Sequence, residues 1–349
     1  MAEKPRPIPA QTLTPLHAVK PKPMEKVTLV IPCYNAGATI VKAVESALAQ
    51  TVPVRIIVID DCSADNSFER LTALAAQHPQ LTVRRHARNG GPGAARNTGL
   101  RMVETAWVAG LDADDFLLPG RMAKLLEHAE RSDADFIADD IIRIWPGQRP
   151  EEGFRVWRDE TLGTVRIDLA RFVRENTLRH VGFRRELGYL KPMMRTAFLF
   201  KHGLSFREDM RLSEDYDFYA RSLAAGAKLD VIDPCGYIAL NRAGSLSKDI
   251  PTKAMQKVLD SDLALLTGPG VSSEARSALR EHLTQTQIDL AWMKLIDAVR
   301  ARNLAAALKI FASPLVVSTS IIVRLGKHFL KIPLYPQGRD EGRDTAAKA

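Results

Sequence analysis

Five aspartates stand directly after short apolar segments, at positions where a strand would end. They are Asp60, Asp61, Asp112, Asp114 and Asp115. Like charges so close together raise the free energy unless a cation or hydrogen bonds compensate them. Hard carboxylate oxygens select Mg²⁺ or Mn²⁺, and such an ion commonly bridges to phosphate oxygens. One aspartate alone could simply cap a helix, so it is the group that predicts a metal and phosphate site.

The elements that must position these aspartates are predicted from the pattern of apolar residues. Apolar runs typical of buried strands lie at 27–32, 54–59 and 106–111, and a shorter strand is expected at 81–85. Segments with helical spacing separate them, at 38–50, 68–77 and 94–103. This alternation predicts an α/β fold with a mostly parallel sheet covered on both faces. Ligands bind such sheets outside the carboxyl ends of the strands, so the aspartates should meet there.

Composition suggests how the first part of the chain is organised. Six prolines within residues 1–23 predict a flexible leader, and an α/β domain is expected at 24–250. Within that domain, 134–144 and 231–240 are each predicted to form a single strand. Residues 146–165 show no regular pattern and are expected to be irregular.

The remainder of the chain is predicted to be helical. Residues 251–335 form the expected helical region, and 336–349 are expected to be a flexible tail. Helical spacing is clearest at 252–266, 273–300 and 304–311.

Composition also excludes several classes of protein. The 349 residues carry a net charge of +8, from 49 basic and 41 acidic side chains, and 46% are hydrophobic, as in globular proteins. Three cysteines without Cys-x-x-Cys spacing argue against a disulfide scaffold or a zinc site. We expect no secretory signal, and no membrane span, because the apolar stretch at 310–323 is too short. The basic residues are dispersed, without a nucleic-acid-binding signature.

Five sequence motifs resemble, in order and spacing, those of the family 2 glycosyltransferases. They are VTLVIPCYNAGATI (27–40), VIDDCSADNS (58–67), GPGAARNTGL (91–100), GLDADDFLLPGRM (110–122) and LSEDYDFYAR (212–221). The resemblance covers about residues 26–250, and DADDFLLPGRM with FIADDIIRI is similar to bacterial exopolysaccharide enzymes of the succinoglycan type. It implies a GT-A, Rossmann-like nucleotide-diphospho-sugar transferase fold with a C-terminal helical extension. It also implies a nucleotide-sugar donor, a divalent metal (Mn²⁺ or Mg²⁺) and inversion at the anomeric carbon.

The resemblance carries roles onto individual positions. Pro32, Tyr34 and Asp61 are expected to line the nucleoside pocket, where the ring can stack on a base and the carboxylate can accept from a uracil imide. Asp112 is expected beside the ribose or in the metal shell. Asp114, the last residue of the Asp-x-Asp motif, is expected to ligate the metal that holds the diphosphate.

Inversion by a single displacement needs a base that takes the proton of the acceptor hydroxyl. A carboxylate can do so when burial raises its pKa towards the working pH. The resemblance assigns this role to Asp215, with Glu214 in support and Asp217 as a rival. The alternative is that these acids only begin the helix at 216–225, where negative charge is favourable.

Two arginines are candidate donor-binding residues. Arg96 follows the glycine-rich segment 90–93 at the start of a predicted helix, a place that favours anions, although a plain salt bridge is an equal alternative. Arg242 lies in a segment that resembles the family's loop over the diphosphate, where it could bind phosphate through two hydrogen bonds. Asp115 is expected to orient its neighbours.

A basic amphipathic helix is predicted at 315–332. Its basic face consists of Arg324, Lys327 and Lys331, and its apolar face of Ile322, Leu325, Phe329 and Ile332. Such a helix can lie on an anionic membrane or dock on the catalytic domain.

These observations predict an inverting, metal-dependent hexosyltransferase in exopolysaccharide biosynthesis. The expected donor is a UDP-sugar, with glucose as the sugar, and the expected acceptor is a lipid-linked oligosaccharide. The expected location is the cytoplasm, with peripheral association on the inner face of the plasma membrane. A nucleotidyltransferase and a non-catalytic nucleotide-binding protein on the same fold remain as alternatives.

Overall fold

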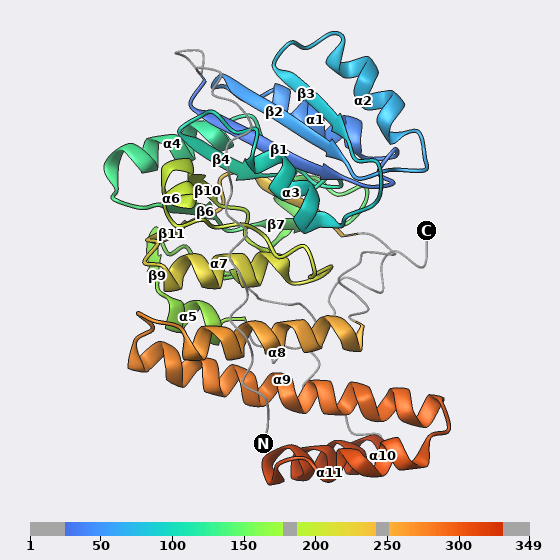
Figure 1. Ribbon diagram of the computed structural model, residues 1–349. Helices are drawn as coiled ribbons and strands as arrows, with labels where there is room; N and C mark the ends of the chain where they lie inside the picture. Colours follow the sequence, from blue (N-terminus) through green and yellow to red (C-terminus); the bar gives the residue numbers. More distant parts are fainter. Residues whose placement is uncertain (1–24, 177–186, 242–250, 331–349) are drawn as a thin grey trace. The chain divides into compact units, whose positions relative to one another are not determined.

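The computed structural model describes residues 25–176, 187–241 and 251–330, which form two compact units (Figure 1). Of these residues, 25–169 and 187–241 belong to the first unit, and 170–176 and 251–330 belong to the second. The predicted leader at 1–23 and the predicted tail at 336–349 lie outside the described residues.

An eight-stranded sheet forms the centre of the first unit. From edge to edge its strands are β3 (Leu81–Arg85), β2 (Val54–Asp60), β1 (Val27–Cys33), β4 (Trp107–Gly110), β10 (Met193–Arg195), β6 (Phe136–Asp139), β11 (Leu229–Ile232) and β9 (Thr164–Ile167). β1 pairs in parallel with β2 and β4, and β2 with β3. β10 and β9 run antiparallel to their neighbours. β1 and β2 are almost entirely buried, which explains their continuous apolar sequences.

Helices connect the parallel strands and cover the sheet. Those of the first unit are α1 (Ile40–Leu48), α2 (Ser67–Ala75), α3 (Pro92–Leu100), α4 (Arg121–Arg131), α6 (Thr196–Lys201) and α7 (Glu214–Ala224). With the strand order β3-β2-β1-β4, right-handed crossovers put α1 and α2 on one face and α3 on the other. The predicted α/β fold with a mostly parallel sheet is therefore confirmed.

Two predicted strands were wrong, because each is broken in the structure. The segment 134–144 divides into β6 and β7 (Ile142–Ile144), and 231–240 divides into β11 and β12 (Tyr237–Leu240). The second half of each belongs to a separate four-stranded sheet of order β5-β12-β7-β8, where β5 is Phe116–Leu117 and β8 is Phe154–Arg155.

The breaks have a polar cause at Asp139 and a backbone cause near Gly236. Asp139 is buried, and its Oδ2 atom accepts hydrogen bonds from the backbone N–H groups of Cys235, Gly236 and Tyr237 at 3.0–3.1 Å. Gly236 has φ of 142°, which favours glycine and turns the chain out of the first sheet. Residues 146–165, predicted to be irregular, contain β8, a short 3₁₀ turn at Pro150–Glu152 and the start of β9.

The second unit is built from helices. They are α5 (Leu169–Arg174), whose first residue belongs to the first unit, α8 (Thr252–Thr267), α9 (Ser273–Arg300), α10 (Leu304–Ile310) and α11 (Leu315–Phe329). α8 packs along α9 through a cluster that includes Met255, Leu259 and Leu283. The side chains of Ser272 and Asn303 accept hydrogen bonds from the first turns of α9 and α10. The helices predicted at 252–266, 273–300 and 304–311 differ from these by at most one residue at each end.

The predicted apolar face of the last helix is divided by the structure. Leu325 packs towards α9, whereas Ile322 is exposed, so these two side chains do not serve one surface. Arg324, expected on an open basic face, forms an ion pair with Asp289 of α9 at 2.6 Å. The side chain of Phe329, together with residues 331 and 332, lies outside the description. In the described part of the chain, no single helix has the length and hydropathy needed to cross a membrane. α10 and α11 taken together meet these length and hydropathy criteria, but a bend of 119° separates the two helices.

The contact between α3 and β1 gives a test of the packing. A methyl group on Gly99 would come within 2.3 Å of Val30 Cγ1. We expect Gly99→Ala to lower the free energy of unfolding by about 1–3 kcal/mol in urea denaturation, because extra volume in a packed core displaces side chains. Gly120→Ala is the control, because nothing lies within 4 Å of its added methyl group.

A double variant identifies the responsible contact. Val30→Ala removes the side-chain methyl groups with which the added methyl group of Gly99→Ala would clash. The double variant should therefore lose less free energy of unfolding than the two single variants lose in sum. Additive losses would show that the destabilisation has another source.

Candidate active site

Three predicted site segments reach one edge of the large sheet. β1 and β2 run in parallel and in register, with Cys33 opposite Asp60, so Tyr34 and Asp61 follow adjacent strand ends. β4 lies on the other side of β1, and the Leu111 N–H still donates to the Val30 carbonyl immediately before Asp112. The carboxyl edge of β1, β2 and β4 therefore carries the predicted nucleoside and metal residues.

Arg96 is buried in α3 and binds carboxylates from two other segments. Its guanidinium donates to Glu214 and, at 2.9 Å, to Asp112, and it lies 3.7 Å from Asp215. Lys191 Nζ lies 2.5 Å from Asp215 Oδ2 and 3.1 Å from Asp112 Oδ2. We call these five residues the Arg96 cluster. With every group ionised, two cations and three carboxylates leave it with a charge of −1.

Burial and charge act in opposite directions in the Arg96 cluster. Burial disfavours the charge on Asp112, but the Lys191 ammonium and the Arg96 guanidinium outweigh it and lower the pKa of Asp112 to about 2. Burial raises the pKa of Glu214, with Arg96 opposing the rise and Asp215 adding to it. Burial would lower the pKa of Lys191, but Asp112 and Asp215 raise it well above its usual value. The cluster therefore keeps Asp112 and both cations ionised.

The helices that carry the cluster begin at unusual backbone positions. Gly91, with φ of 89° and ψ of 171°, precedes α3 in a conformation that is essentially restricted to glycine. Ser213, with φ of 61°, is left-handed and precedes α7. α7 then opens with Glu214 and Asp215, whose charges suit a helix N-terminus as well as the cations of the cluster. Glu214 and Asp215 can therefore begin the helix and also belong to the candidate active site, so the two interpretations are compatible.

Asp61 is fixed by donors from two loops. Its Oδ1 atom accepts from the Gly90 N–H at 2.9 Å and lies 2.7 Å from His86 Nδ1, and its Oδ2 atom accepts from the Gly91 N–H at 2.7 Å. The other ring nitrogen of His86 lies 3.0 Å from Thr98 Oγ1 in α3. A carboxylate has about four lone-pair positions, so an Asp61 held in this way can accept one further hydrogen bond.

Tyr34 is exposed on the loop that directly follows β1. The residue is 53% exposed, whereas Pro32 is half-buried in β1. Asn35 ties the two loops together, because its N–H donates to Ser63 Oγ and its Oδ1 accepts from the Ala64 N–H. Asn35 and Cys62, which follow Tyr34 and Asp61, both have positive φ. An exposed ring held on such a loop can stack on a base.

Asp115 links the Asp-x-Asp loop to the second sheet. Its carboxylate accepts from the Tyr237 hydroxyl at 2.9 Å and from the Leu240 N–H at 2.9 Å. The Tyr237 hydroxyl in turn accepts from the Asp112 N–H at 3.2 Å. Tyr237 thus connects Asp115 to the backbone of Asp112.

The Asp-x-Asp loop fits a divalent cation by the chemistry of its donors. Burial, followed by the negative charges of Asp114 and Asp112, raises the pKa of Asp115 to about 8, so a cation bound at this loop would stabilise the ionised carboxylate. Among the described residues, no three or more His, Cys, Asp or Glu side chains are grouped to hold a metal by themselves. Mg²⁺ is commonly held by one or two carboxylates together with substrate phosphates. These residues suit a cation that is completed by a diphosphate.

The structure brings most of the predicted site residues together, but not all of them. Asp112, Arg96, Glu214 and Asp215 meet in one cluster. The rival base Asp217 is buried against Arg221, at 2.6 Å, and lies 4.0 Å from Arg207. Arg242 lies outside the described residues.

Sequence reasoning missed three contributors. Lys191 precedes Glu214 in the sequence and was given no specific role. His86 follows the third strand directly, so the rule that ligands gather at carboxyl strand ends would have selected it. Tyr237 lies in a strand predicted to continue from 231, and no local signal separates it from an ordinary core residue.

The sheet is mostly parallel, and its edge carries an Asp-x-Asp loop, an aspartate held by backbone donors and a helix that begins with acidic residues. This combination defines a GT-A nucleotide-sugar transferase. Comparison with known proteins identifies the family. The model of glycosyl transferase family 2 matches residues 28–183. Succinoglycan biosynthesis protein ExoU of Rhizobium meliloti (strain 1021) is 42% identical over 73% of this chain and 74% of its own length. ExoO of the same organism is 34% identical over 81% of this chain and 80% of its own.

The chain belongs to glycosyl transferase family 2, and it is a glycosyltransferase. Solved structures agree on the fold. S. aureus TarS 1–349 in complex with UDP has a TM-score of 0.60, with 17% identity over 86% of this chain and 92% of that one. The mannosyltransferase PcManGT from Pyrobaculum calidifontis, in complex with GDP-Man and Mn²⁺, has a TM-score of 0.52, with 16% identity over 93% and 92%.

Removal of Lys191 tests the Arg96 cluster. Lys191→Gln leaves Asp215 and Asp112 without the ammonium that both contact, so the carboxylates repel each other and lose their orientation. We expect sugar transfer to fall about tenfold or more, measured as the turnover of the purified enzyme. Lys201→Gln, at an exposed position in α6, is the control and should keep wild-type turnover. Unchanged turnover in Lys191→Gln would contradict a role for the cluster.

Proposed function

We propose that this glycosyltransferase moves a hexose from a UDP-sugar to a lipid-linked oligosaccharide, with inversion at the anomeric carbon, during synthesis of an exopolysaccharide. The observation that carries the proposal is the Arg96 cluster, in which the expected base Asp215 and the Asp-x-Asp residue Asp112 share the cations Arg96 and Lys191. The proposed location is the cytoplasmic face of the plasma membrane, where a lipid-linked acceptor would be presented.

The donor part of the proposal rests on the loops that follow β1 and β2. Asp61 retains one acceptor position, which suits the imide N–H of uracil, and Tyr34 offers a ring for stacking. Complexes of the structural neighbour TarS with UDP and UDP-GlcNAc support a uridine nucleotide. The two succinoglycan biosynthesis relatives support a role in exopolysaccharide synthesis, and the lipid-linked acceptor is kept as the expected one. Glucose is kept as the expected sugar.

The proposed reaction is a single displacement. The acceptor hydroxyl attacks the anomeric carbon, the bond from that carbon to the donor phosphate oxygen breaks, and the hydroxyl proton passes to Asp215. The products are an inverted glycoside and UDP. Lys191 and Arg96 orient the Asp215 carboxylate, and Glu214 anchors Arg96. Asp114 and Asp112 would hold a divalent cation, which would supply Lewis-acid stabilisation of charge on the leaving diphosphate.

The alternative of nucleotidyl transfer predicts a different ligand. A nucleotidyltransferase binds a nucleoside triphosphate and retains part of it in the product, whereas the proposed enzyme releases UDP. Membership of glycosyl transferase family 2 favours sugar transfer. Non-catalytic nucleotide binding would give donor binding without UDP release.

Donor binding tests the Asp-x-Asp loop. We expect UDP to bind in isothermal titration when Mn²⁺ or Mg²⁺ is present and to bind at least about tenfold more weakly without the cation, because the metal joins the carboxylates to the diphosphate. Asp114→Asn should remove this metal dependence. Asp133→Asn, an exposed acid paired with Lys228, is the control. Equal UDP affinity with and without the cation would contradict the metal assignment, and a preference for UTP would favour nucleotidyl transfer.

Turnover measurements test the donor and the assignment of Asp215 as the catalytic base. Release of the nucleoside diphosphate, which is UDP or GDP according to the donor, should be measured with UDP-glucose, UDP-GlcNAc and GDP-mannose, each with and without a lipid extract as acceptor. We expect release only when donor and acceptor are combined, and we expect UDP-glucose to be the active donor.

Asp215→Asn should lower kcat by about 10²-fold or more while UDP affinity stays close to wild type. Wild-type turnover in Asp215→Asn would show that another residue is the base. Loss of turnover in Asp217→Asn, while Asp215→Asn stays active, would assign the base to Asp217.

A further inference from the structure

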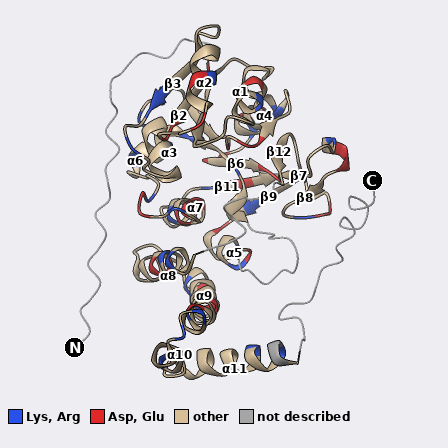
Figure 2. Cartoon of the chain, turned by 90° about the vertical axis from the view of Figure 1, so that its right-hand side faces the viewer, with Lys and Arg blue, Asp and Glu red and all other residues tan. Residues whose placement is uncertain are grey.

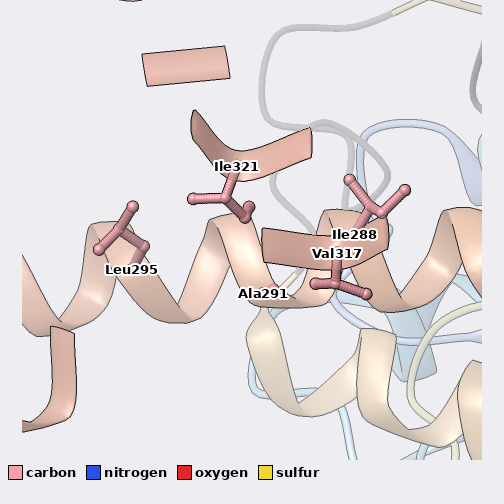
Figure 3. Packing of buried hydrophobic residues seen from close by; sticks show 5 residues of the cluster. All are labelled: Ile288, Ala291, Leu295, Val317 and Ile321. Atoms are coloured by element: carbon pink, nitrogen blue, oxygen red, sulfur yellow. The ribbon is translucent and has the colours of Figure 1, made fainter. Parts of the chain in front are cut away.

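Helix α11 has two apolar faces, and only one of them is covered by the described part of the second unit. Val317 and Ile321 are buried against Ile288, Ala291 and Leu295 of α9 (Figure 3). This contact, with the Arg324–Asp289 ion pair, fixes the rotation of the helix about its axis. The opposite face consists of Leu315, which is 84% exposed, Val316, Ile322 and Val323, followed by Leu330.

Helix α10 repeats the arrangement. Ala307 and Ile310 pack against the same cluster on α9. Leu304, which is 72% exposed, and Leu308 point away from it, and Phe311 is exposed directly after the helix. Two consecutive helices thus each place one apolar face on α9 and leave a second one uncovered within the described residues. We call the uncovered residues of both helices the α10–α11 surface.

The charges around the α10–α11 surface have a single sign. The sequence contains no acidic residue from Ala298 to Leu330, and Figure 2 accordingly shows α10 and α11 without red segments. Its basic residues are Arg300, Arg302, Lys309, Arg324 and Lys327. Arg324 is paired with Asp289, whereas the structure gives the other four no ion pair with any described acid. The apolar surface is therefore bordered by positive charge that the described residues leave uncompensated.

The dimensions of these helices favour a position along a membrane surface. α11 has 15 residues and is about 22 Å long, short of the roughly 30 Å of a bilayer core. Both helices are also fixed to α9 along one side by the buried cluster. A helix with an apolar face, a basic border and one side attached to its own protein suits insertion to the depth of the lipid headgroups.

A second copy of the chain is the competing occupant, and charge argues against it. A symmetrical dimer through the α10–α11 surface would place this acid-free, basic region against itself, where like charges repel. Anionic lipid headgroups match both features at once, because the acyl boundary accepts the leucines and valines and the headgroups compensate the bases.

We propose that the α10–α11 surface binds anionic lipid membranes, with Leu304, Leu308, Leu315, Val316, Ile322 and Val323 in the acyl boundary and Arg300, Arg302, Lys309 and Lys327 at the headgroups. This interaction is independent of the transfer reaction, because the surface contains none of the candidate active-site residues. It can therefore be measured without donor or acceptor.

The experiment is co-sedimentation of the full chain with vesicles of phosphatidylcholine alone or of phosphatidylcholine mixed with phosphatidylglycerol. We expect the mixed vesicles to bind the wild-type chain about tenfold or more tightly than the neutral ones, with an affinity that falls as salt is added. Equal binding to both vesicles, without salt dependence, would overturn the proposal.

Two sets of substitutions separate the apolar and the charged parts. The triple variant L308S/V316S/V323S and the charge variant R302Q/K309Q/K327Q should each lose about tenfold or more of the affinity for mixed vesicles. Leu263→Ser, at an exposed leucine of α8 in the same unit, should bind as wild type. Circular dichroism and thermal melting check that the variants are folded, and the charge variant leaves the apolar packing untouched. Wild-type vesicle binding in folded examples of both variants would overturn the proposal.

Light scattering after size exclusion tests the competing occupant on the same samples. A wild-type dimer that the triple variant converts to a monomer, with vesicle binding unchanged, would assign the surface to a second copy and overturn the proposal. The proposal would be supported if the wild type and the triple variant have the same oligomeric state but differ in vesicle binding. Loss of vesicle binding with wild-type UDP affinity would show that the surface acts separately from donor binding.

Discussion

The buried guanidinium of Arg96 is the interaction on which the candidate active site depends. It joins α3 to the Asp-x-Asp loop through Asp112 and to the start of α7 through Glu214, with Asp215 close by. These segments are far apart in the sequence, and three carboxylates would repel one another without it. Lys191 supplies the second cation from the segment before β10. A buried network of this kind contributes little net stability, but it specifies one arrangement of the groups that it contains.

A second set of buried polar contacts supports the first. Arg121, fully buried at the start of α4, donates to the Asp139 carboxylate and to the Lys191 carbonyl, so it holds the backbone that presents the Lys191 ammonium. Asp139 in turn accepts three N–H groups, from Cys235, from Gly236 and from Tyr237, the first residue of β12. Burial raises the pKa of Tyr237, whose hydroxyl therefore stays protonated and donates to Asp115. The small second sheet is thereby linked to the Asp-x-Asp loop.

Sequence reasoning reached the order of strands and helices and the edge at which the acids gather, because both follow from local patterns. Apolar runs of about six residues predict buried strands, and a parallel sheet places their carboxyl ends together. It failed where a side chain binds backbone far away in the chain, as Asp139 does near residue 236. It also gave no role to Lys191, because only the folded chain brings this ammonium to Asp112. For α11 the sequence indicated an amphipathic helix, but only the packing on α9 reveals which apolar face is covered.

The short stretch from Gly90 to Arg96 serves two tasks at once. Its first two N–H groups hold Asp61, and one turn further on its arginine holds Asp112 and Glu214. A tilt at the start of α3 would therefore move the carboxylate of Asp61, which is proposed to recognise the nucleobase, together with the proposed reaction centre. Efforts to retune this enzyme towards a different nucleotide by reshaping the surroundings of Asp61 will disturb its rate as well, unless the compensating changes are made on the same helix.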